Sequence, residues 1–82
     1  MIFIEIEGFF PDPNPDNTLQ YEKAVPQTLE TSVLNVMGWS TLHDVPMGEH
    51  LLSPDQASTI IELVGEPFRV ELDYYMGLCT TN

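Results

Sequence analysis

The sequence has almost no positive charge. Its 82 residues include 13 Asp and Glu but only one lysine and one arginine, so the formal net charge is −11 and the isoelectric point is about 4.1. Nucleic acids and anionic membranes are bound mainly through cationic side chains, so this composition argues against both as direct partners. It favours a basic protein partner, which long-range attraction would bring in quickly.

The sequence also lacks a second cysteine and any long apolar run. Cys79 alone cannot form an intrachain disulfide, which suits a reducing compartment such as the cytosol. The first residues, MIFIEIEG, carry two glutamates and no basic segment, unlike a signal peptide. No run approaches the roughly 20 apolar residues that span a bilayer. We therefore expect a cytoplasmic protein without a membrane segment, folded as a single domain over residues 1–82.

One stretch has part of the spacing of a calcium loop. Asp12, Asn14 and Asp16 match the first ligand positions, but Asn17 stands where such a loop needs glycine and Lys23 where it needs glutamate. The three prolines between residues 11 and 15 also stiffen the segment. A proline-rich turn explains these residues better than a metal site.

No catalytic motif is present elsewhere. His43, Asp44, His50 and Cys79 are residue types that serve in nucleophilic or metal sites, yet none has a diagnostic spacing, and the glycines form no phosphate cradle. We therefore expect neither an enzyme nor a protein with a metal or cofactor.

The clearest local structure begins at Ser53. Ser53 and Gln56 form a capping box, Pro54 suits the first helical position, and Gly65 supplies a left-handed exit. Between these ends one apolar stripe recurs at helical spacing, formed by Ala57, Ile60, Ile61 and Val64. The sequence therefore predicts a helix from residue 53 to 64.

Beyond Pro67 the hydrophobic period changes to two. One face of the predicted strand 68–76 is apolar, with Phe68, Val70, Leu72, Tyr74 and Met76. The other face carries Arg69, Glu71, Asp73 and Tyr75.

The first half of the chain predicts two strands and a helix. Residues 1–7 alternate with isoleucines inward, and residues 18–24 predict a second strand with Leu19 and Tyr21 inward. Residues 28–37 carry a helical apolar face that ends at Gly38. Trp39 should fold back onto that helix end. A short extended piece near residues 41–43 is a further expectation.

The predicted order is strand, strand, helix, helix, strand, which is α+β. We expect a three-stranded antiparallel sheet with both helices packed on one face and the last strand beside the first. The open face would then carry five carboxylates and one outward tyrosine: Glu5, Glu7, Glu22, Glu71, Asp73 and Tyr75. Like charges placed opposite one another destabilise a sheet, so folding gains nothing from this pattern. We interpret these six residues as a partner-binding surface, in which Tyr75 would contact arginine or lysine.

The segment EHLLSPDQASTIIELVGEPFRVELDYYM, residues 49–76, resembles the C-terminal half of a family of small acidic bacterial toxin-immunity proteins. In that family a Leu-Ser-Pro-x-Gln-Ala helix start, here residues 52–57, leads to a short helix and an acidic-aromatic strand that ends in an aromatic pair, here Tyr74-Tyr75. The hydrophobic hairpin and the first helix before Gly38 are also similar, so the resemblance covers most of the chain. It implies an inhibitor of a basic toxin, and transfers no binding residue to this sequence.

Three hypotheses follow. The first is an immunity protein that covers the basic active-site cleft of a toxin domain, a nuclease in particular, with carboxylates in place of substrate phosphates. The second is a nucleic-acid mimic that inhibits a host DNA-binding or defence protein, which would require carboxylates spaced along a ridge. The third, a small enzyme or metal protein, has no motif to support it.

Overall fold

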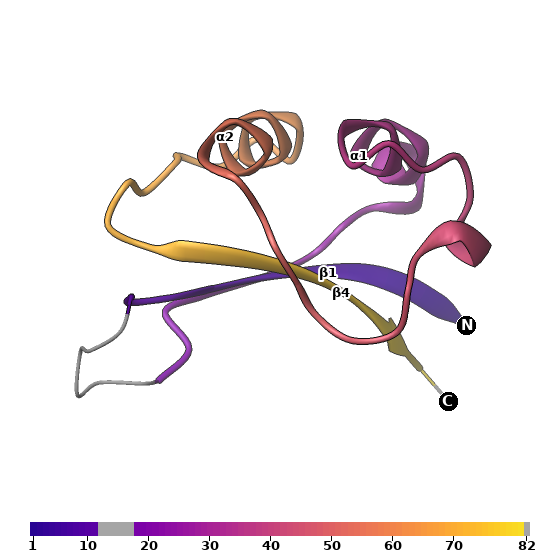
Figure 1. Ribbon diagram of the computed structural model, residues 1–82, viewed down its shortest axis with the longest axis horizontal. Coiled ribbons are helices and arrows are strands. Elements are labelled where there is room, and N and C mark those ends of the chain that lie inside the picture. The colour runs from indigo at the N-terminus through magenta and orange to yellow at the C-terminus, as the bar shows by residue number, and fades with distance from the viewer. Residues whose placement is uncertain (12–17, 82) are drawn as a thin grey trace.

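The sheet of this protein is covered by helices on one face only. The computed structural model describes residues 1–11 and 18–81, and in it both α-helices lie over the same face of a four-stranded antiparallel sheet (Figure 1). The strand order is β2-β1-β4-β3, with β1 Ile2–Phe9, β2 Tyr21–Ala24, β3 His50–Leu51 and β4 Asp73–Thr80. The helices are α1 Glu30–Val36 and α2 Pro54–Leu63, and two 3-10 turns are η1 Gln27–Leu29 and η2 Leu42–Asp44.

The predicted α+β class is confirmed, but the expected three strands are four. The additional strand, β3, consists of two residues that pair with Tyr75 and Met76 of β4. The extended piece expected near residues 41–43 is instead the turn η2, which Thr41 and Asp44 close with a capping box. As expected, β4 lies beside β1, and the two pair along their whole length, from Ile2↔Thr80 to Phe9↔Asp73.

Both predicted helices are present, and their local signals explain their ends. At α2, the Ser53 hydroxyl accepts a hydrogen bond from the Gln56 N–H at 3.2 Å, and the Gln56 side chain accepts one from the Ser53 N–H at 3.0 Å. Gly65 ends this helix with a φ of 77°. The first helix begins as η1 and continues as α1, after which the Trp39 N–H donates to the Leu34 carbonyl at 2.9 Å.

Three strand boundaries differ from the prediction. β1 continues to Phe9, β2 begins only at Tyr21, and β4 runs from Asp73 to Thr80 instead of from Phe68 to Met76. The prediction was wrong at residues 68–72 because the chain needs the segment between α2 and β4 to return from the helix layer to the sheet. Val70, expected inward, is among the most exposed apolar residues, and Leu19 is also exposed.

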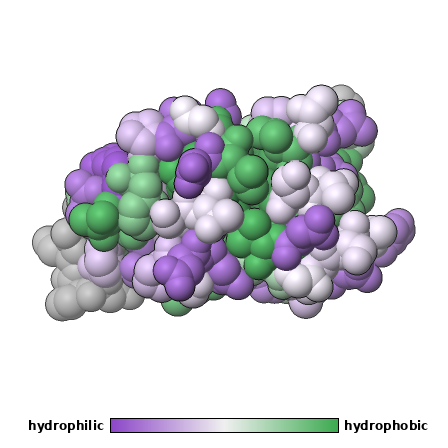
Figure 2. Space-filling view, turned by 90° about the horizontal axis from the view of Figure 1, so that it is seen from above, coloured by the Kyte–Doolittle hydropathy of each residue, from purple (hydrophilic) through white to green (hydrophobic). Residues whose placement is uncertain are grey.

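The core lies between the helices and the upper face of the sheet. It contains the apolar residues of β1 and β4 together with the inner faces of both helices; the fully buried side chains are Ile4, Ile6, Val33, Leu34, Ile60, Ile61, Tyr74 and Met76. On the outside of the helix layer, apolar and hydrophilic side chains are mixed (Figure 2). The opposite face of the sheet has no helix over it (Figure 1), and it is there that the carboxylates gather.

Candidate functional site

The open sheet face brings three carboxylates together through strand register. Glu7 of β1 lies opposite Glu22 of β2 on one side and opposite Tyr75 of β4 on the other. Glu5 lies two residues along β1, on the same face because side chains alternate along a strand. Carboxylate oxygen atoms of Glu5, Glu7 and Glu22 all lie within 4.8 Å of one another.

A fourth carboxylate reaches the same place from the segment before β3. Glu49 lies over Gly77 of β4, where a Cβ atom would come 3.5 Å from the Glu49 Cγ. The Glu49 side chain is hydrogen-bonded to Glu7. We call Glu5, Glu7, Glu22 and Glu49 the acidic cluster. A hollow of about 370 Å³ lies beside it, lined by Glu5, Glu7 and Glu49 and by the loop 45–48.

Crowding of these carboxylates changes their protonation. The hydrogen bond to Glu49 raises the pKa of Glu7 from 4.5 to about 7, and burial and the charges of Glu49, Glu5 and Glu22 act in the same direction. Two carboxylates can share a hydrogen bond only while a proton lies between them. Cys79, on the same face, has a raised pKa because of burial and the nearby charge of Glu5. The cluster therefore holds a proton near neutral pH, mainly through the hydrogen bond between Glu7 and Glu49, and the neighbouring negative charges favour the same state.

Neither of the two cationic side chains relieves this charge. Lys23 lies opposite Ile6 in the β1–β2 register, which places it toward the helix side, and its Nζ is 3.7 Å from Glu66. The Arg69 guanidinium is 3.4 Å from Glu71 in the segment before β4. Within the described ranges, the acidic cluster thus has no lysine or arginine as an ion-pair partner.

The structure brings together most of the residues that were predicted to face a partner. Glu5, Glu7 and Glu22 are adjacent and Tyr75 is next to Glu7, as expected. Asp73 is on the same face but lies opposite Phe9, at the end of β4 away from Glu5. Glu71 was placed wrongly, because it precedes the strand and pairs with Arg69.

Sequence reasoning missed Glu49. Its neighbours carry no strand or helix period, and it reaches the cluster only because the chain loops below the sheet edge before β3 (Figure 1). The Glu49 side chain lies directly over Gly77, at a distance where a Cβ atom would be in ordinary van der Waals contact with it. An isolated glycine inside an alternating segment was the only signal that something approaches β4 closely.

The other candidate residues have structural roles or lie elsewhere. Asp44 accepts hydrogen bonds from the N–H groups of Ser40 and Thr41, both at 3.0 Å, and these lower its pKa. The His50 ring lies 2.8 Å from the Pro46 carbonyl and packs edge-on against Trp39. The calcium-loop positions 12, 14 and 16 lie outside the described residues.

Among the described residues, Glu5, Glu7 and Glu22 are also the ones whose oxygen atoms could share a cation. Exposed carboxylates often cluster without a metal, so spacing alone assigns none here. No helix in the described part of the chain is long and apolar enough to cross a membrane.

Comparison with known proteins gives no relative: no protein-family model, no curated protein and no solved structure matches this chain.

Proposed function

We propose that this protein binds a basic protein through its acidic cluster and acts as an immunity protein that neutralises a toxin domain. The observation that carries the proposal is the convergence of four carboxylates from three separate segments, without a lysine or arginine beside them in the described chain. The pKa of Glu7, raised to about 7, indicates that this convergence costs the fold energy. A cationic partner would remove that cost.

The shape of the site supports a lysine or arginine side chain as the contacting group. The hollow beside the cluster has carboxylates on the sheet side and Pro46 and Met47 on the loop side. Lysine and arginine side chains join a long apolar stem to a cationic head, so the stem would contact the loop while the head meets the carboxylates. Tyr75, next to Glu7, offers a ring on which a guanidinium can stack.

The active-site cleft of a nuclease supplies such cations, because it must bind phosphates. The carboxylates of the cluster would take the place of these phosphates and block the cleft. The resemblance of residues 49–76 to acidic immunity proteins supports the same proposal. A nucleic-acid mimic is less well supported, since the four carboxylates form a compact group and not a line that follows a phosphate backbone.

Co-expression tests this proposal. The chain should restore growth to cells that express the toxin domain encoded next to its own gene. Glu5→Gln/Glu22→Gln should weaken protection and slow association at low salt. The control variant Glu30→Gln/Glu62→Gln removes the same amount of charge from the helices, and it should protect the cells as well as the unmodified protein does. Equal loss with both pairs would mean that total charge and not the cluster matters, and absence of any complex would refute the proposal.

Binding should also release a proton. A cation placed against the cluster favours ionised Glu7, whose pKa then falls toward its ordinary value. Calorimetry near pH 6.5 in buffers with different heats of ionisation should therefore give different apparent enthalpies. Glu7→Gln should abolish the difference, and an unchanged difference in that variant would show that the proton comes from another group.

A further inference from the structure

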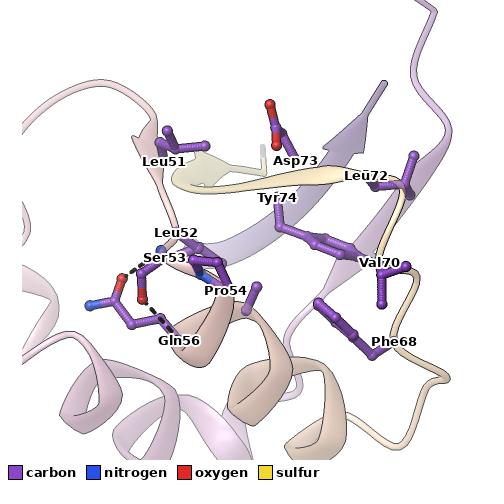
Figure 3. A pocket seen from close by; sticks show the side chains of 11 residues that line it. Leu51, Leu52, Ser53, Pro54, Gln56, Phe68, Val70, Leu72, Asp73 and Tyr74 are labelled. Carbon is purple, nitrogen blue, oxygen red and sulfur yellow. Dashed lines mark hydrogen bonds between the residues drawn. The ribbon is translucent and has the colours of Figure 1, made fainter. Parts of the chain in front are cut away.

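A second hollow lies on the other side of β3 and is apolar. It has a volume of about 590 Å³ and lies between the start of α2 and the segment that leads into β4. In Figure 3, Phe68, Val70 and Leu72 face Pro54 across this apolar groove, and Tyr74 lies between them. Leu51 and Asp73 belong to its lining on the sheet side.

The groove exposes apolar surface that the fold does not use. Val70 is 85% exposed, Leu51 is 61% exposed and Phe68 is 36% exposed, whereas the floor residue Tyr74 is buried. The two walls of the groove are nevertheless held in place by specific contacts. Phe68 stacks on Tyr74 with ring centroids 5.6 Å apart, and the Tyr74 hydroxyl accepts a hydrogen bond from the Arg69 N–H at 3.1 Å. On the other wall, the capping box holds the start of α2.

The groove continues the surface of the acidic cluster. Leu51 lies opposite Tyr75, Tyr75 opposite Glu7, and Glu7 opposite Glu22, so one row across the four strands leads from the groove to the cluster. Glu49 and Leu51 are two residues apart, about 7 Å along an extended chain. Protein interfaces commonly place an apolar anchor in a pocket beside a charged rim.

We propose that the apolar groove receives a large apolar side chain from the same lysine- and arginine-rich partner segment that covers the acidic cluster, an inference that rests on the proposed function. Charge complementarity favours this occupant, since Asp73 lines the groove and the chain as a whole carries −11. A second copy of the chain would bring another −11 to the same place and be repelled. An anionic membrane surface would be repelled in the same way.

Two model peptides test this inference on the intact protein. Both have blocked ends and two runs of three lysines, which are separated by tryptophan in one peptide and by glycine in the other. The tryptophan peptide should bind about tenfold more tightly in titration calorimetry, as expected for partial burial of a large apolar side chain. Amide signals of Leu51 and Val70 should shift in NMR spectra only with the tryptophan peptide.

A substitution at the rim of the groove tests whether the tryptophan preference comes from the groove itself and not from charge attraction. Val70→Asn should remove most of the tryptophan preference, and because Val70 is so exposed the fold should tolerate it. Leu19→Asn is the matched control: Leu19 is 41% exposed and precedes β2, at the opposite edge of the sheet. It should leave the preference unchanged, and thermal melts confirm that both variants fold.

The outcomes distinguish the two proposals. Equal affinity for the two peptides, or a preference that Val70→Asn leaves intact, would overturn the groove assignment and leave the proposed function standing. Binding of both peptides that is indifferent to salt and to Glu5→Gln/Glu22→Gln, with the tryptophan preference retained, would support the groove and overturn the acidic cluster as the docking site. A dimer in sedimentation experiments that Val70→Asn dissociates would assign the groove to a second copy and overturn the inference.

Discussion

Replacing Glu7 by glutamine should stabilise the protein at high pH and not at low pH. The pKa of Glu7 in the folded protein is about 7, above its ordinary value of 4.5, so the folded state binds the proton more tightly than the unfolded chain does. The contribution of Glu7 to the free energy of unfolding is therefore fully present below about pH 4.5 and is lost as the pH rises through 7. Glutamine remains uncharged throughout and can still donate a hydrogen bond to Glu49.

The magnitude follows from the difference between these two pKa values. In a site shielded from water it would correspond to about 3 kcal/mol, since one pKa unit is worth about 1.4 kcal/mol. Glu7 is only partly buried on the open face, and solvent screening reduces the effect to about 1 kcal/mol. For a domain of this size, such a gain raises the melting temperature by about 4–8 °C.

Thermal and urea unfolding at pH 4 and pH 8 provide the assay. The Glu7→Gln variant should have the same free energy of unfolding as the unmodified protein at pH 4 and a higher one at pH 8. Glu62→Gln removes the same charge from an exposed position on α2 and corrects for general self-repulsion. Glu49→Gln should give a similar gain, and the double variant little more, because either change removes the shared proton site. If Glu7→Gln changed the free energy of unfolding equally at both pH values, or lowered it at pH 8, the raised pKa assigned to Glu7 would be refuted.

Three further predictions concern stability. Gly8→Ala should lower the free energy of unfolding in urea by about 1–3 kcal/mol, because the new Cβ would lie 3.0 Å from a side-chain atom of Leu72. Gly77→Ala, whose nearest contact would be 3.5 Å away, should lower it clearly less. Equal losses in the two variants would contradict the packing at β1. Ser53→Ala should lower the free energy of unfolding by about 1 kcal/mol through loss of the cap on α2, and a neutral result would mean that water replaces it. Moderate sodium chloride should raise the melting temperature, since it screens repulsion among exposed carboxylates; a flat response would indicate that these charges are already compensated.

The features predicted well were those with local causes. The capping box at Ser53 and the exit at Gly65 depend on neighbouring residues, and α2 formed between them as expected. The alternation of isoleucines in β1 likewise fixed which face is buried, and this placed Glu5 and Glu7 outward. Pairing of the last strand beside the first put Tyr75 next to Glu7.

The features predicted poorly depend on the path of the chain between layers. Residues 68–72 alternate like a strand, but the return from α2 to the sheet uses them as a connection, which exposes Val70 and leaves Glu71 outside the strand. β3 has only two residues, too few to show a hydrophobic alternation. Glu49 reaches the site only because the segment before β3 passes over β4. One hollow is bounded by the segment before β3 and the other by the segment between α2 and β4, so sequence reasoning could nominate the carboxylates but not the cavities.

The central position of β1 and β4 has a consequence for synthesis. β1 is made before β4, and the middle of the sheet forms only when the two strands pair, from Ile2↔Thr80 to Phe9↔Asp73. The Met1 and Thr81 backbones are joined by hydrogen bonds of 2.9 and 3.1 Å. Until β4 leaves the ribosome, the nascent chain exposes the isoleucines of β1 and an unpaired strand edge. Folding of this sheet consequently depends on pairing between strands that are far apart in the sequence, and such distant pairing is slow.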